Sequence, residues 1–185
     1  MGVAIEQLKK EHAAIETMLK ILDAVCGRLK AGETIDPAHL AQIVEFFKGF
    51  ADRCHHGKEE EILFPALELA GVPKEGGPIG VMLQEHDQMR GYMKGLADAV
   101  GRYGAGEPAA RDAIIGAAWN YAAMLRRHIE KENQVLFKMA EMQLAQEEEA
   151  ELAVRFESME VEKIGAGAHE RLHALLDRLE RTYLG

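Results

Sequence analysis

The chain contains the same histidine pattern twice. His55-x-x-x-Glu59 and His128-x-x-x-Glu132 are each followed by Leu and Phe, at the eighth and ninth positions after the histidine. Residues four apart share one face of a helix, so each copy directs an imidazole and a carboxylate toward the same point. The repeat therefore indicates two copies of half a metal site.

A Glu-His pair precedes each copy at nearly the same distance. His12 lies 43 residues before His55, and His86 lies 42 residues before His128. Together the four imidazoles and two carboxylates form a mixed nitrogen and oxygen donor set, which suits a first-row transition metal. The predicted metal ligands are His12, His55, Glu59, His86, His128 and Glu132.

Helix-forming residues dominate the chain, and breaker residues divide it into long segments. We expect helices over about 3–31, 37–70, 79–103 and 107–144, separated by glycines and prolines. Short connections favour antiparallel neighbours, so the predicted fold is all-α: an up-down four-helix bundle built from two repeated αα-hairpins.

Residues 145–185 differ in character from the predicted bundle domain, residues 1–144. We expect an acidic amphipathic helix over 146–164 and a final helix over 168–183. This C-terminal helical extension is expected to pack on the bundle or to form a homo-oligomer contact.

The segment around His55 offers two registers for a metal-binding face. His55 and Glu59 continue an apolar helix face, whereas His56 and Glu60 continue a polar face that should meet water. A site inside the bundle needs the apolar face. We therefore expect His56 to be a surface group or to support the ligands from behind.

Several other polar residues have ordinary structural interpretations. Glu60, Glu61 and the run 147–149 are expected to be solvated, as Glu runs usually are. His169-Glu170-x-x-His173 matches the zinc-protease helix, but only 12 residues follow it. We expect this motif to have a structural use or to lie beside the mouth of the bundle.

Composition limits the class of protein. The formal net charge of −9 argues against a nucleic-acid partner, which would need a basic footprint. The N-terminus lacks the apolar core of a signal peptide, and the longest apolar stretch, 114–125, is too short to span a membrane. Cys26 and Cys54 have no pairing motif, as expected for free thiols. We expect a cytoplasmic protein with no membrane partner.

The repeated signature resembles the hemerythrin-like cation-binding domain, a four-helix bundle around a non-haem di-iron centre. The resemblance covers about residues 4–140. It implies that Glu59 and Glu132 bridge two iron ions. It further implies that one iron is completed by His12 and His55, and the other by His86 and His128.

Two positions depart from the oxygen-carrying members of that family. Those proteins have a fifth histidine one turn after the third-helix histidine, where this chain has Arg90. They place an Asp five residues after the last histidine, where this chain has Glu132 at four. The departures imply an open position near His86, or an additional ligand such as Tyr92 or Tyr121.

These features predict a di-iron protein that binds or senses a small ligand, such as dioxygen, nitric oxide or peroxide, or iron itself. The alternative is a di-iron enzyme acting on peroxide or nitric oxide, and a third hypothesis is a metal-free helical scaffold. Arg90 and Glu16 each lie four residues after a predicted ligand histidine. We expect Arg90 to pair with Glu16 or a neighbouring carboxylate close to the open position.

Overall fold

The computed structural model describes residues 2–163 and 165–185, and these residues form helices and connecting turns with no strand. The predicted all-helical class is confirmed. The elements are α1 (Val3–Lys30), α2 (Pro37–Phe46), η1 (Phe47–His56), η2 (Glu59–Leu63), α3 (Phe64–Leu69), α4 (Pro78–Gly104), α5 (Ala110–Lys131), η3 (Glu132–Leu136), α6 (Phe137–Gln143), α7 (Gln146–Lys163) and α8 (Ala168–Tyr183).

Local sequence signals explain where the helices begin and end. The Asp36 side chain accepts a hydrogen bond from the backbone N–H of Ala38, and Pro37 opens α2. Gly32 and Gly106 follow α1 and α4 with φ of 88° and 81°, a left-handed conformation that suits a residue without Cβ. The helix bounds agree with the predicted ones to within three residues.

Three segments, η1, η2 and η3, are π-helical and lie inside longer helical runs. Residues 37–69 form one such run, and residues 110–143 form the other. A π-helix closes its hydrogen bonds from i to i+5, so its turns are wider than those of an α-helix. Side chains within and beyond it therefore point in directions that the α-helical period does not give.

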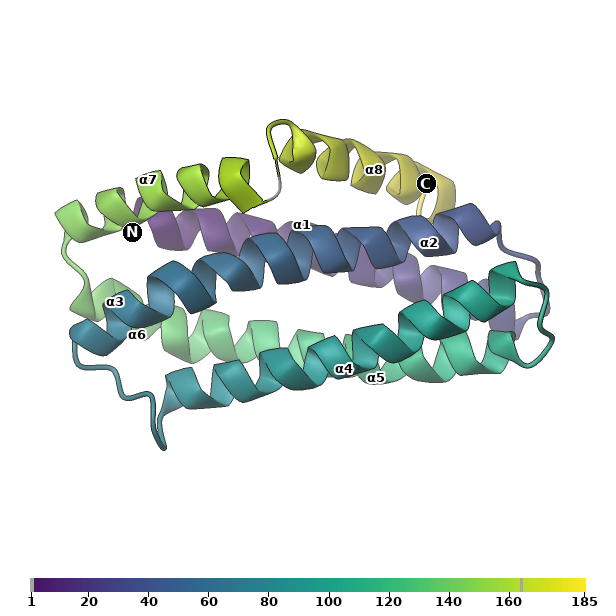
Figure 1. The fold of residues 1–185 in the computed structure, drawn as a ribbon, viewed down its shortest axis with the longest axis horizontal. Coiled ribbons are helices and arrows are strands. Elements are labelled where there is room, and N and C mark those ends of the chain that lie inside the picture. Colours follow the sequence, from purple (N-terminus) through teal and green to yellow (C-terminus); the bar gives the residue numbers. More distant parts are fainter. Residues whose placement is uncertain (1, 164) are drawn as a thin grey trace.

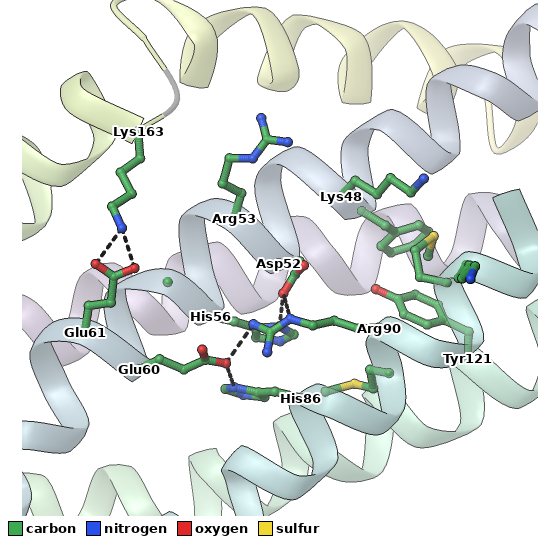
Figure 2. A pocket seen from close by; sticks show the side chains of 15 residues that line it. Lys48, Asp52, Arg53, His56, Glu60, Glu61, His86, Arg90, Tyr121 and Lys163 are labelled. Atoms are coloured by element: carbon green, nitrogen blue, oxygen red, sulfur yellow. Dashed lines mark hydrogen bonds and ion pairs between the residues drawn. The ribbon is translucent and has the colours of Figure 1, made fainter.

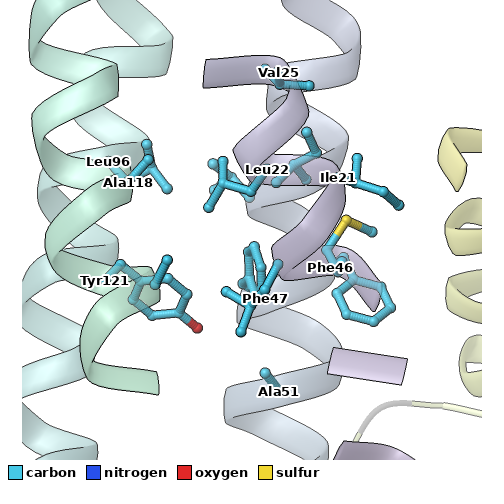
Figure 3. Close-up of a cluster of buried hydrophobic side chains, with 14 of the residues drawn as sticks. Ile21, Leu22, Val25, Phe46, Phe47, Ala51, Leu96, Ala118 and Tyr121 are labelled. Atoms are coloured by element: carbon cyan, nitrogen blue, oxygen red, sulfur yellow. The ribbon is translucent and has the colours of Figure 1, made fainter. Parts of the chain in front are cut away.

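Four long helical segments lie side by side: α1, the run 37–69, α4 and the run 110–143 (Figure 1). We call these four segments the bundle. Two apolar clusters fill it. The first joins α1, α2, η1, α4 and α5, with Phe47 against the edge of Tyr121 (Figure 3). The second joins the start of α1 with η2, α3, η3 and α6. Buried polar residues separate the two clusters.

The C-terminal helices α7 and α8 both lie along α1 (Figure 1). Glu149, which we expected to be solvated, is instead buried, and its carboxylate accepts hydrogen bonds from the N–H groups of Ala4 and Ile5. These donors are left free at every helix start, so Glu149 caps α1 from a distant part of the chain. None of the described helices is long and apolar enough to cross a membrane.

Candidate metal centre

The six predicted ligands converge between the two apolar clusters, and all six are buried. Each of the four long segments of the bundle contributes to the centre. The histidines come from α1, η1, α4 and α5, and the two glutamates stand at the first positions of η2 and η3. Two of the three π-helical segments therefore begin at a candidate ligand, as is common for π-helices at functional sites.

The two glutamates each lie between the halves of the repeat. Glu59 places Oε1 3.4 Å from Nε2 of His55 and Oε2 3.5 Å from Nε2 of His86. Glu132 repeats this arrangement, with Oε1 3.2 Å from Nε2 of His128 and Oε2 3.1 Å from Nε2 of His12. Each carboxylate thus contacts one histidine from each half of the repeat, which is the arrangement that a bridging ligand requires.

In each of the four ligand histidines, Nε2 faces the two glutamates and the other ring nitrogen, Nδ1, points outward. Each Nδ1 lies 2.6–3.0 Å from an oxygen that accepts hydrogen bonds. Since carboxylate and amide oxygens accept, each Nδ1 donates, and Nε2 is directed to the interior. Outer partners of this kind fix the orientation of metal-binding histidines. The pairs are His12 with Asn133, His55 with Glu11, His86 with Glu60, and His128 with Glu85.

His56 does not meet water, so the prediction that it is a surface group was wrong, while a role in supporting the ligands stays a prediction. Its side chain is 2% exposed and stacks on His86, with ring centroids 4.0 Å apart. Glu60, also predicted to be solvated, is half-buried and bonded to His86. The physical reason is η1, whose wider turns place both His55 and His56 inside the bundle. The α-helical period of 3.6 residues per turn, on which the prediction was based, incorrectly assigned the two histidines to different faces.

The donors fall into two groups that share one carboxylate. His12, His55, Glu59 and Glu132 form one, which we call the first group. His56, Glu59, His86 and His128 form the other, the second group. Within each group one donor atom per residue lies within 4.8 Å of the others, which is compact enough to surround one ion.

The centre is short of hydrogen-bond partners on its inner side. Both oxygens of Glu59 and Glu132, and Nε2 of His12, His55 and His56, are buried without a hydrogen bond. Buried carboxylates left without a partner are costly, and binding a cation removes that cost. A donor set of imidazole nitrogens and carboxylate oxygens fits a transition-metal ion. The residues present therefore fit the metal that the repeat predicts.

The pKa values also show an environment that needs positive charge. Burial and the nearby Glu132 carboxylate raise the pKa of Glu59 well above its usual range. Burial opposes ionisation of Glu132 as well, but His128 and His12 hold its pKa well below normal. Two adjacent buried carboxylates repel each other, so in the metal-free protein these directions favour a proton on Glu59 and the negative charge on Glu132.

The outer carboxylates reveal a further part of the repeat. Glu11, besides holding His55, forms an ion pair with Lys58, and Glu85, besides holding His128, pairs with Lys131. Each lysine lies three residues after its histidine. The full repeat is thus His-x-x-Lys-Glu, and the lysine is visible in the sequence at the same position of both copies.

A cavity of about 400 Å³ reaches the second group (Figure 2). His56 and His86 line it, and Arg90 crosses it with hydrogen bonds to Asp52 and Glu60. Arg90 thus pairs with neighbouring carboxylates, and Glu16 is exposed on α1 instead. The guanidinium stands beside the candidate ligands on the open side of the centre.

The two tyrosines considered as further ligands lie differently. Tyr121 is buried and lines the same cavity (Figure 2), and burial raises the pKa of its hydroxyl far above normal. Tyr92 of α4 is partly buried against the first apolar cluster, and its hydroxyl accepts a hydrogen bond from Gln88.

His169 and His173 lie on α8, outside the bundle centre. Their Nε2 atoms are 2.9 Å apart, and both rings pack against Phe50 of η1. His169 belongs to a third group of donors with Cys54 and Glu160.

Comparisons with known proteins agree with the donor pattern. The model of the hemerythrin HHE cation-binding domain matches residues 3–140, and the chain belongs to this family. Similar proteins include uncharacterized proteins of Mycobacterium bovis and of Mycobacterium tuberculosis. Each is 26% identical over 179 residues, which cover 97% of this chain and 69% of the relative. No solved structure matches the chain.

Proposed function

We propose that the chain binds two iron ions between its four long helices, which form the family's up-down four-helix bundle. In this proposal His12 and His55 hold one ion, His86 and His128 hold the other, and Glu59 and Glu132 bridge them. The observation that supports it best is the pair of carboxylates that each contact a histidine from both hairpins.

We further propose that His56 is an additional ligand of the second ion. It is buried, has no hydrogen bond on either ring nitrogen and belongs to the second group. The third-helix position that holds a fifth histidine in oxygen carriers is Arg90 here. His56 would supply that fifth imidazole from the neighbouring helix.

The protein would use this centre to bind or sense a small ligand, such as dioxygen, nitric oxide or peroxide. Bridged iron ions, when bound, supply reversible redox chemistry and positions for a small ligand. The chain supplies the rest. The cavity gives access beside His56 and His86, and the Arg90 guanidinium attracts anions by charge and by its fork of hydrogen-bond donors.

Elemental analysis of anaerobically iron-loaded protein tests the proposal, and two irons per chain are expected. Optical spectra under air and under reductant should then change on addition of azide or nitric oxide. Zinc in a recombinant preparation is compatible with the site, because zinc binds such donors as strongly as iron. A preparation that binds no metal would refute the proposal.

A peroxide-decomposition assay on the same sample separates a binding protein from an enzyme. Binding or sensing predicts a stable spectral change without sustained release of dioxygen. Sustained turnover that depends on bound iron would assign the centre to the enzymatic alternative.

A further inference from the structure

Beyond the bundle centre, three donors meet where the C-terminal helices touch the bundle. Cys54 lies on η1, Glu160 on α7 and His169 on α8. One donor atom from each lies within 4.8 Å of the other two. The two consecutive C-terminal helices and the distant η1 thus bring a thiol, a carboxylate and an imidazole to one point.

The carboxylate of Glu160 has one oxygen already engaged and one directed to this cluster. Oε1 accepts hydrogen bonds from Lys58 and, at 3.3 Å, from Gln7. Oε2 lies 3.6 Å from Nδ1 of His169. That Nδ1 is buried and has no hydrogen-bond partner, so a polar atom faces the cluster with its bonding capacity unused.

The other side of the His169 ring is held in place. Its Nε2 lies 2.9 Å from Nε2 of His173, and the two rings pack against Phe50 with centroids 5.2 Å away. When His169 donates Nε2–H to His173, the lone pair of Nδ1 faces Glu160 and Cys54. This is the outer hydrogen bond that fixes the tautomer of a metal-binding histidine.

We propose that Cys54, Glu160 and His169 bind a single zinc-like divalent cation, separate from the bundle centre. Sulfur, nitrogen and oxygen donors together suit zinc, which takes four ligands in a tetrahedron. Three protein donors leave one position for water. On binding, the sulfur–hydrogen bond of Cys54 is replaced by a sulfur–metal bond, and the proton leaves to solvent.

A nucleophilic role for Cys54 fits the structure less well. Its side chain is 1% exposed, so no substrate reaches the sulfur in this conformation. Glu160 and His169 are partly exposed and give a small cation a path inward. Because the ligands come from η1, α7 and α8, the ion would fasten both C-terminal helices to the bundle beside His55.

Cobalt substitution tests the site, because a cysteine thiolate bound to cobalt gives a charge-transfer absorption that histidine and carboxylate ligands do not. Untagged protein, first loaded with iron, is titrated with Co²⁺ alone. We expect this absorption together with one bound cobalt per chain. Since only a cysteine produces the signal, the absorption tests the site even if the bundle takes cobalt in place of iron, in which case only the cobalt stoichiometry would be higher.

Matched variants locate the ligand. Cys54→Ser and His169→Ala should each lose the absorption and the bound cobalt. Cys26→Ser, which removes the other cysteine, should keep both. Circular dichroism and iron content confirm that each variant is folded. The proposal is overturned if wild-type protein shows no thiolate absorption, if Cys54→Ser retains it, or if Cys26→Ser abolishes it.

Discussion

The two halves of the repeated site have matching residues but differ in their surroundings. In the first half Lys58 is 0% exposed, pairs with Glu11 and also contacts Glu160 of α7. In the second half the matching Lys131 is 37% exposed and pairs only with Glu85 among the described residues. The C-terminal extension therefore encloses one half of the site and leaves the other near solvent.

The inner side of the site differs between the halves as well. His56 follows His55 in the first half of the repeat, whereas Ile129 follows His128 in the second half. The cavity with Arg90 adjoins His56 and His86, so the second group combines the extra imidazole with the access route. A duplicated sequence thus gives an asymmetric centre, in which we expect structural support on one side and ligand exchange on the other.

The largest effect should come from the carboxylates that both halves share. Glu59→Ala and Glu132→Ala each remove contacts to both groups, so bound iron should fall below one per chain. The loss of affinity should exceed the roughly 10–100-fold cost of losing an outer hydrogen-bond partner. His12→Ala, by contrast, should empty mainly the first group. Elemental analysis measures this, and two irons retained in Glu59→Ala would refute the bridging assignment.

Replacing the outer glutamates, Glu11 and Glu85, should lower the free energy of unfolding by different amounts in the two halves of the site. Glu11→Gln leaves the buried Lys58 with one carboxylate fewer, and breaking a buried pair costs about 3 kcal/mol or more. Glu85→Gln frees the partly exposed Lys131, which water can solvate, at a cost of about 1 kcal/mol or less. Urea unfolding of the metal-free proteins compares them. Equal destabilisation would show that the extension does not distinguish the halves.

Replacing His56 by the residue of the second hairpin tests its role. His56→Ile should lower iron affinity in the second group by about tenfold or more, as loss of one ligand implies. It should also alter the optical spectrum of the oxidised protein. His55→Ala should lower the occupancy of the first group instead. If His56→Ile keeps wild-type affinity and spectrum, the second group has no fifth imidazole.

The matching histidines of the two copies of the repeat, His55 and His128, should have pKa values shifted in opposite directions in the metal-free protein. Burial and His12 lower the pKa of His55 to about 4. Burial opposes charge on His128 too, but Glu132 and Glu85 raise its pKa to about 9. Its Nε2–H can then donate to Nε2 of His86 at 3.0 Å. NMR titration of the imidazoles should show His128 charged and His55 neutral at neutral pH.

The sign of the stability change follows from the same two groups. The His55 contribution is lost as pH falls from about 6.5 toward 4, because only the unfolded chain takes up its proton readily. The His128 contribution is present below about 6.5 and is lost as pH rises through about 9. The midpoint temperature of thermal unfolding should therefore fall at both ends of this pH range. Matching pKa values for the two histidines would contradict the asymmetry.

The smallest effect should be at the mouth of the second group. Arg90→Gln should weaken azide binding to the oxidised protein by about fivefold, the equivalent of about 1 kcal/mol for a partly screened charge. The azide affinity of this variant should also depend less on salt concentration than that of the wild-type protein. Glu16 occupies the matching position on α1 but is exposed, so Glu16→Gln should leave azide affinity unchanged. Equal behaviour of the two variants would confine Arg90 to a surface role.

Much of this organisation was predictable from the sequence. Glycines and prolines marked the helix ends, and the repeat identified six residues that the structure brings together. His56 was missed because the helical period changes within η1, and no local sequence signal gave that change. Glu60 and Glu149 were missed because their partners, His86 and the start of α1, are distant in the sequence. Acidic runs alone do not show which member finds a buried partner.

Mössbauer spectroscopy of the oxidised, iron-loaded protein tests the central claim most directly. The account predicts two iron environments of equal intensity, because the first group offers two imidazoles and the second offers three. Shared carboxylates should also couple the two ions magnetically. A single environment from one uncoupled iron per chain would contradict a bridged and asymmetric pair.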